Sequence, residues 1–303
     1  MNKRVLLVVN PKSGKRQGQA QARVIASKLA ALGYDSDIRL SRQPSDLQDM
    51  VNDRFLRSYH LVGIVGGDGS MHEWVNAVLR NHENGVLPIA LFPCGTGNAF
   101  NEDIGCGSID ETLDCIRAGR ITSIDVAELN FSGERLWSFN ILGCGLVADI
   151  NRMAEKMRWL GGMRYNVASV LQLLRNKTRD FTIRVDEQTR SGRYSFVLAC
   201  NTRYTGKGMM MAPQAKLHDG KFDVLLVKAC SKLTLLQLFP KIFKGTHVSA
   251  PILEYFQCRS LEVQSTHLPE PTNVDGEMKG STPLVMTVHT EKIRVFVKTI
   301  NAT

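Results

Sequence analysis

A glycine-rich turn, Gly66-Gly67-Asp68-Gly69, follows an apolar stretch and precedes a segment with helical spacing. Glycines lack a Cβ atom, so their backbone N–H groups can approach a ligand closely. The start of a following helix adds a dipole that favours anions. These features indicate a phosphate site, at which Asp68 would hold a metal ion or accept a proton. The alternative interpretation is a tight strand-to-helix turn that Asp68 caps.

Further loops of this kind follow other apolar stretches. Pro93-Cys94-Gly95-Thr96-Gly97-Asn98 follows one, Asn10-Pro11-Lys12-Ser13-Gly14 follows another, and Ser41 follows a third. The carboxyl ends of parallel strands share one edge of a sheet, and ligands of α/β folds bind there. The loops match neither the dinucleotide fingerprint nor the P-loop pattern. They predict a nucleotide-binding edge of a different type.

The elements that would position these loops alternate between strand and helix over residues 1–124. Predicted strands are Val5–Val9, Ser36–Leu40, Leu61–Val65 and Leu87–Phe92. Helical spacing covers Gln17–Leu32 and Met71–Leu79, and further helices start near Pro44 and after the capping box Ser108–Glu111. This alternation predicts a doubly wound parallel α/β domain.

Residues 125–303 have a different character. Short apolar runs predict many strands, and only Gly145–Leu174 and Leu233–Phe243 have helical spacing. We therefore expect a second domain that is rich in antiparallel β-structure.

The composition narrows the classes of function. A net charge of +9 indicates an anionic partner, but no nucleic-acid-binding signature accompanies it. The sequence has no run of ~18 apolar residues, so it predicts no membrane-spanning helix. Seven scattered cysteines without a zinc pattern suggest reduced thiols in a cytoplasmic protein.

Four motifs together resemble one known family. In order they are Asn10-Pro11-x-Ser13-Gly14, Gly66-Gly67-Asp68-Gly69-Ser70 with Glu73 and Asn76, Pro93-x-Gly95-Thr96-Gly97-Asn98, and Asp275-Gly276-Glu277. This combination is similar to the diacylglycerol kinase and sphingosine/ceramide kinase superfamily. The resemblance implies an α/β nucleotide-binding domain, of the kind shared with NAD kinases, followed by a β-sandwich lipid domain. It implies transfer of the γ-phosphoryl of ATP, with Mg²⁺, to a hydroxyl of a lipid such as diacylglycerol, ceramide or a sphingoid base. A soluble nucleotide kinase of the NAD kinase type is the alternative.

The resemblance also implies roles for individual residues. Asp275 matches the general base proposed in bacterial lipid kinases, whereas Asp68 matches the carboxylate given that role in sphingosine kinases. Glu277 is a third carboxylate that could hold Mg²⁺ or accept the hydroxyl proton. The expected nucleotide contacts are Asn10, Ser41, Gly66, Gly67, Asp68, Gly69, Ser70 and Thr96, together with the phosphate-binding arginines Arg158 and Arg164.

Further residues bear on the acceptor and on a structural metal. Asn151 stands where sphingosine kinases carry a carboxylate for the sphingoid head, which favours a neutral head group; Asp149 is the other candidate for substrate contact. The segment around Asp219 resembles a bacterial-family segment that binds a structural Mg²⁺. There Asp219 would be the side-chain ligand, and Lys216 and Lys221 would supply carbonyls.

One apolar segment, Leu233–Lys244, has flanking lysines and no acid. It could dock on anionic lipid or be a buried helix that covers the sandwich. We expect a cytoplasmic enzyme in peripheral contact with the inner membrane face, and a homodimer is one option for its assembly.

Overall fold

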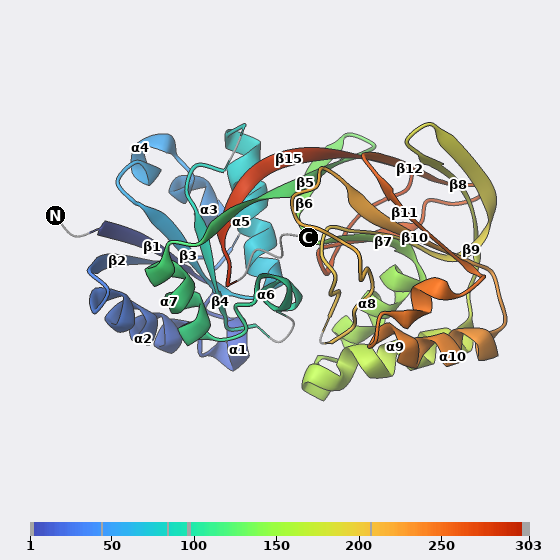
Figure 1. Ribbon diagram of the computed structural model, residues 1–303, viewed down its shortest axis with the longest axis horizontal. Helices are drawn as coiled ribbons and strands as arrows, with labels where there is room; N and C mark the ends of the chain where they lie inside the picture. Colours follow the sequence, from blue (N-terminus) through green and yellow to red (C-terminus); the bar gives the residue numbers. More distant parts are fainter. Residues whose placement is uncertain (1–2, 44, 84, 96–97, 207, 299–303) are drawn as a thin grey trace. The chain divides into compact units, whose positions relative to one another are not determined.

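The structure is a computed structural model that describes residues 3–43, 45–83, 85–95, 98–206 and 208–298 (Figure 1). It divides into two compact units. The first contains the chain up to Ile124 and again from Glu291 onward, and the second is Asp125–Thr290. The expected division into residues 1–124 and 125–303 stays a prediction; by its contacts, the chain from Glu291 onward belongs to the first unit. The chain returns because the end of the last strand pairs in parallel with a strand of the first unit, with Val295 opposite Ile89.

The first unit is a parallel sheet covered by helices on both faces (Figure 1). Its strands are β1 (Lys3–Val9), β2 (Tyr34–Leu40), β3 (Leu61–Gly66) and β4 (Ile89–Pro93), in the order β2-β1-β3-β4. Its helices are α1 (Ser13–Arg16), α2 (Gly18–Ala30), α3 (Ser45–Met50), α4 (Asp53–Leu56), α5 (Asp68–Asn81), α6 (Ala99–Ile104) and α7 (Ile109–Ala118). Contacts pair α2 with α7 and α3 with α5. The predicted doubly wound α/β architecture is confirmed.

The central strands of this sheet are apolar because both of their faces are covered. Residues Val5 to Val9 of β1 and all six residues of β3 are buried. Burial of each valine, leucine or isoleucine side chain among them contributes about 1.5–3 kcal/mol. This core fixes the carboxyl ends of the strands, from which the glycine-rich loops extend.

The second unit is built mainly from antiparallel strands, as predicted. They are β5 (Ile121–Phe131), β6 (Glu134–Ser138), β7 (Ile141–Gly145), β8 (Arg179–Val185), β9 (Gln188–Cys200), β10 (Phe222–Lys228), β11 (Leu253–Cys258), β12 (Ser260–Ser265), β13 (Pro271–Val274), β14 (Glu277–Ser281) and β15 (Leu284–Phe296). The order is β14-β13-β7-β9-β8-β12-β15, and β10 pairs with β9 and β11. Strands β5 and β15 connect the two units along the chain.

Three helices cover one face of the strands β7, β9 and β10 (Figure 1). They are α8 (Leu146–Lys156), α9 (Arg164–Arg175) and α10 (Lys232–Ile242), with 3₁₀ turns η1 (Arg158–Met163) and η2 (Thr246–Ser249). The predicted helical segment Gly145–Leu174 is interrupted because Gly161 adopts φ 57°, ψ −130°. A left-handed φ of this kind favours glycine and breaks a helix. None of the helices in the described ranges is long and apolar enough to cross a bilayer.

A buried histidine under these helices predicts a pH-dependent stability. His247 in η2 is 2% exposed, its Nε2 lies 2.9 Å from the Met211 carbonyl, and burial lowers the pKa of its imidazole below the ordinary value. Below about pH 6.5 the unfolded chain therefore binds a proton that the folded chain binds less readily. We expect the free energy of unfolding in urea to decrease between pH 7.5 and 5.5, and to decrease less in His247→Gln. An equal decrease in both proteins would contradict this origin.

Candidate active site

Loops at the carboxyl ends of β1, β3 and β4 come together in the first unit. The backbone N–H of Asn10 donates to the Val65 carbonyl at 3.3 Å, and that of Cys94 donates to the Gly66 carbonyl at 2.8 Å. The Asn10 side-chain amide lies 3.5 Å from the Ser70 hydroxyl. Ser41 is buried at the end of β2, and its N–H donates to the Val9 carbonyl. The sheet therefore gathers the predicted loops at one edge.

Two glycines let the second and third loops touch through their backbones. A Cβ added to Gly95 would lie 2.8 Å from the Cα of Gly67, and one added to Gly67 would lie 3.1 Å from the Cα of Gly95. The first distance is shorter than real Cβ contacts and the second is tighter than most of them, so a larger residue at either position would require its neighbour to move. The close approach leaves a surface of backbone atoms at the sheet edge.

The Asp68 carboxylate connects the same two loops. Its Oδ2 accepts the N–H of Ala99 at 2.8 Å, and its Oδ1 accepts the N–H of Phe100 at 3.2 Å. Charge-assisted bonds of this kind hold the start of α6, and with it the end of the Pro93–Asn98 loop, against the start of α5. The capping interpretation of Asp68 is therefore partly right, but the helix that it caps is α6.

The start of α5 presents backbone donors to this edge. Gly67 precedes the 14-residue helix and has no side chain to bond the first helical N–H groups. Gly69 and Ser70 lie in the first turn. An anion at this helix start would be favoured by both the N–H groups and the helix dipole. Thr96, predicted to contact the nucleotide, lies outside the described residues.

In the second unit, Asp275 is bound by the backbone around it. Its Oδ1 accepts the N–H groups of Asn140 and Ile141, each at 3.0 Å, and the hydroxyl of Ser138 at 2.7 Å. Its Oδ2 accepts the N–H of Phe139 at 3.3 Å. The side chain is 3% exposed, and its backbone φ is 50°. Asp275 therefore organises the turn between β6 and β7.

Glu277 has a different environment from the other two acids. It follows the Asp275-Gly276 turn and is exposed, and its side chain makes no hydrogen bond or ion pair with another described residue. The pKa of the nearby Tyr165 phenol is raised, first by burial and further by the negative charge of Glu277. Of the three predicted catalytic acids, Glu277 is exposed, Asp68 is half-buried and Asp275 is buried.

The predicted substrate residues lie behind this turn. Asn151 is 2% exposed; its side-chain amide donates to the Gly276 carbonyl at 2.6 Å and accepts the Tyr165 hydroxyl at 3.3 Å. Asp149 lies 2.5 Å from the Arg179 guanidinium, which also binds Glu270 at 2.8 Å. Asn151 and Asp149 are thus engaged in the support of the Gly276 turn and of α8.

Of the two predicted phosphate-binding arginines, only Arg164 has a described side chain. It lies 3.4 Å from Glu155 and within 4.8 Å of the Tyr165 ring centre. The backbone of Arg158 starts η1, and its side chain lies outside the described part of the chain. The structure thus places Arg164 beside the Asn151–Tyr165 pair.

Two family models match the chain in consecutive segments. The diacylglycerol kinase catalytic domain matches residues 4–129, which contain the three loops. The YegS C-terminal NAD kinase beta sandwich-like domain matches residues 140–297, which contain the Asp275 turn. The chain belongs to the diacylglycerol kinase and sphingosine kinase superfamily. Its catalytic domain indicates an ATP-dependent lipid kinase, and the predicted resemblance is confirmed.

Relatives of this lipid kinase carry different substrate names. Sphingosine kinase 1 of Arabidopsis thaliana is 26% identical, with 89% of this chain and 66% of that protein aligned. A YegS-like lipid kinase of Shewanella frigidimarina is 28% identical over 88% of this chain and 85% of that protein. A crystal structure of a diacylglycerol kinase from Bacillus anthracis superimposes with a TM-score of 0.79 at 22% identity, covering 98% and 97% of the two chains, and supports the fold. These proteins share the family, and their names give different acceptor lipids.

Several supporting residues of this lipid kinase were not predicted. Ser138 and the backbone of 139–141 bind Asp275 from 134 or more positions away, and Arg179 joins Asp149 to Glu270. Tyr165 adjoins Arg164 in the sequence, but nothing in its spacing points to Asn151. The Asp275 contacts accompany the pairing of β7 with β13, which no local pattern encodes.

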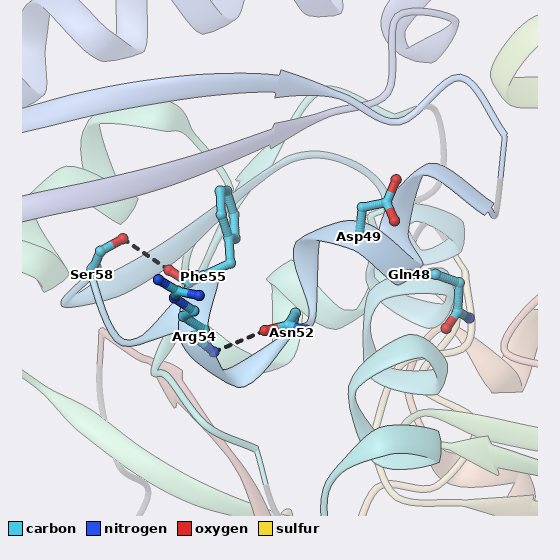
Figure 2. Close-up of a pocket in the computed structure, with 6 residues that line it drawn as sticks. All are labelled: Gln48, Asp49, Asn52, Arg54, Phe55 and Ser58. Atoms are coloured by element: carbon cyan, nitrogen blue, oxygen red, sulfur yellow. Dashed lines mark hydrogen bonds between the residues drawn. The ribbon is translucent and has the colours of Figure 1, made fainter.

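The first unit of the lipid kinase also has a shallow polar hollow of about 460 Å³ (Figure 2). It is lined by Gln48, Asp49, Asn52, Arg54, Phe55 and Ser58. These residues belong to α3, α4 and their flanking turns, which precede β3 in the chain. The hollow therefore lies apart from the carboxyl-end loops and contains none of the predicted nucleotide residues.

Proposed function

We propose that the chain transfers the γ-phosphoryl of ATP to a hydroxyl of a membrane lipid, diacylglycerol or ceramide in preference to a sphingoid base. The observation that supports this most is the junction of three loops at the carboxyl edge of the first sheet, in a family of lipid kinases. Phosphoryl transfer needs alignment and charge neutralisation more than covalent chemistry. Backbone donors and a helix start meet that need for the phosphates.

In this proposal the first unit binds the nucleotide. Asn10, Ser41, Gly66 to Ser70 and Thr96 contact ATP. The contact of Arg158 and Arg164 with the phosphates stays a prediction of the family resemblance. Asp68 keeps the loops at β3 and β4 together through its bonds to Ala99 and Phe100. Its effect on the reaction is therefore exerted through the nucleotide-binding loops.

Asp68→Asn is expected to raise the KM for ATP about 10- to 100-fold, because one charge-assisted bond to a loop N–H is lost. The measurement is the initial rate against ATP concentration. A matched control is Asp186→Asn, since Asp186 also accepts two backbone N–H groups, from Arg259 and Ser260, but in the second unit. A lower kcat at unchanged KM would instead give Asp68 a role in the chemical step.

Among the acids of the second unit, we propose that Glu277 receives the proton of the lipid hydroxyl, directly or through water. General bases act by contact with the proton that they take, so an accessible carboxylate is required. The oxygens of Asp275 already accept four hydrogen bonds of the fold, whereas Glu277 is exposed. Asp275 then acts as the positioning residue that sets the Gly276-Glu277 turn.

The choice of acceptor rests on Asn151. Its amide is buried and holds the Gly276 carbonyl, so it offers no negative charge to a cationic amine. A neutral diol or amide head group is compatible with such a site. The test is transfer of label from ATP to diacylglycerol, ceramide and sphingosine in mixed micelles, with NAD as the soluble comparison. Preferential labelling of sphingosine would contradict the assignment to a neutral head group.

A structural Mg²⁺ is also part of the proposal. Asp219 accepts the N–H of Lys221 at 3.1 Å and the Gln257 amide at 3.2 Å. Close by, burial raises the pKa of Asp223 to about 6, the charge of Asp219 adds to this, and Asp223 Oδ2 is buried without a hydrogen bond. Excess buried negative charge suits a hard cation held by Asp219 with the carbonyls of Lys216 and Lys221. The described residues contain no group of three His, Cys, Asp or Glu side chains placed for a metal, so carbonyls would be needed.

The alternative of a soluble NAD kinase-type enzyme has less support, because the matching catalytic domain is that of diacylglycerol kinases. We also propose that the protein acts at the cytoplasmic face of a membrane, as peripheral contact with its substrate requires. A homodimer remains compatible with this mode of action.

A further inference from the structure

Exposed apolar side chains gather on one part of the second unit. Among the described residues, seven of the eleven exposed large hydrophobic side chains belong to η1, α9 and α10 or directly adjoin them. We call this set the helical docking face: Trp159, Met163, Val170, Leu171, Leu174, Leu233 and Phe243. The three elements contact one another through α9, and α9 and α10 lie along the same side of the unit (Figure 1).

The two most prominent members lie on η1. Trp159 is 81% exposed and Met163 is 66% exposed. The left-handed φ of Gly161 between them turns the chain at the junction of α8 and α9. Soluble proteins rarely expose several large apolar side chains together without a binding role. Tryptophan in particular is enriched where protein meets the interface of a bilayer.

Basic side chains lie near this face. Between Lys156 and Arg179 the chain has no acid, and the side chains of Lys156, Arg175 and Lys177 are exposed. Between Asp223 and Glu254, a stretch that includes α10, there is again no acid, and Lys232, Lys241 and Lys244 flank the apolar positions. Basic residues beside exposed apolar ones complement a surface of anionic lipid head groups.

The segment Leu233–Lys244 was predicted either to dock on anionic lipid or to be a buried helix. Some of its apolar side chains are buried and others are exposed. Leu235 is 3% exposed and packs in the core, with Leu236 and Phe239 partly buried against it. Leu233 is 63% exposed and Phe243 is 38% exposed. Thus α10 covers the sheet and contributes only the edge of the helical docking face.

We infer that the helical docking face binds the surface of an anionic bilayer, with Trp159 and Met163 inserted at the level of the head groups. This deepens the proposed function and rests on it, because a lipid kinase must reach an acceptor that stays in the bilayer. The combination of basic and apolar side chains favours a bilayer as the partner, because a bilayer surface offers negative charge and an apolar layer beneath it.

The tryptophan fluorescence of the protein can report on membrane binding by Trp159, because the other tryptophans, Trp74 and Trp137, are only 2% and 5% exposed. Without ATP, vesicles of phosphatidylglycerol and phosphatidylcholine are expected to shift the emission to the blue, and brominated lipid is expected to quench it. Trp159→Ser should weaken binding in vesicle sedimentation at least tenfold. Leu268→Ser, which removes a 73% exposed side chain outside the face, should change it less than twofold. Unchanged emission, or equal binding of Trp159→Ser and wild type, would overturn the inference.

Measurements of lipid turnover and of oligomeric state distinguish membrane docking from other roles of this face. Turnover of a monomeric short-chain diacylglycerol by Trp159→Ser should stay within twofold of wild type, whereas turnover of long-chain lipid in vesicles should decrease at least tenfold. A wild-type dimer that Trp159→Ser converts to monomer would assign the face to contact between copies and overturn the docking. Vesicle binding by a protein that phosphorylates no lipid would refute the proposed function and leave the docking in place.

Discussion

Replacing Glu277 with glutamine is expected to lower the kcat of lipid phosphorylation by about 10²- to 10⁴-fold, the usual contribution of a general base. The free energy of unfolding should remain within about 0.5 kcal/mol of wild type, because exposed side chains without partners contribute little to stability. Steady-state rates at saturating ATP and lipid give kcat, and urea unfolding gives the stability.

Glu187→Gln is the matched control, since Glu187 is an exposed glutamate on the β8–β9 turn. If kcat of Glu277→Gln is within threefold of wild type, the proton is not taken by Glu277.

Asp275→Ala is expected to have the largest effect on folding. It leaves three buried backbone N–H groups and the Ser138 hydroxyl without their acceptor. An unsatisfied buried donor costs about 1–3 kcal/mol, so the free energy of unfolding should decrease by more than about 3 kcal/mol. This is a large part of the stability of a typical domain. Urea unfolding monitored by circular dichroism measures it.

Two milder substitutions make the Asp275 prediction specific. Ser138→Ala removes a single donor and should cost about 1 kcal/mol. Asp275→Asn retains one oxygen and should have a cost intermediate between those of Ser138→Ala and Asp275→Ala. A residue that serves only as a catalytic base would leave the unfolding of Asp275→Ala close to that of wild type, and that result would remove the positioning role.

Much of the first unit could be predicted from local patterns. The apolar runs at Val5–Val9 and Leu61–Val65 have no polar alternation because both faces of their strands are covered. Glycine loops directly after such runs must lie at the carboxyl edge of a parallel sheet, and the junction of Gly67 with Gly95 follows from that topology.

The environments of the three acids could not be predicted in this way. Asp68 bonds to N–H groups 31 and 32 residues away, and Asp275 to groups 134 to 136 residues away. The strands that bring Asp275 there, β13 and β14, have four and five residues, too few for a clear alternation of side chains. The sequence alone does not show which of Asp68, Asp275 and Glu277 has a carboxylate available as a general base. The hydrogen bonds of Asp68 and Asp275 in the fold distinguish them from Glu277.

The exposure of Trp159 also escaped prediction, since a helical segment gives no hint of where it will bend. Only the break at Gly161 and the packing of α9 on the sheet leave Trp159 and Met163 outside the core. The charge around them, by contrast, was visible in the sequence from the start.

The most direct test of phosphoryl transfer to a membrane lipid compares two labelled nucleotides. Purified protein is incubated with vesicles that contain diacylglycerol or ceramide and with ATP labelled at either the γ- or the α-phosphorus, and the lipids are extracted. We expect γ-label, and no α-label, in the organic phase with the wild-type protein, and almost none with Glu277→Gln. Label that stays in the aqueous phase as phosphorylated NAD, with none in either lipid, would contradict the account.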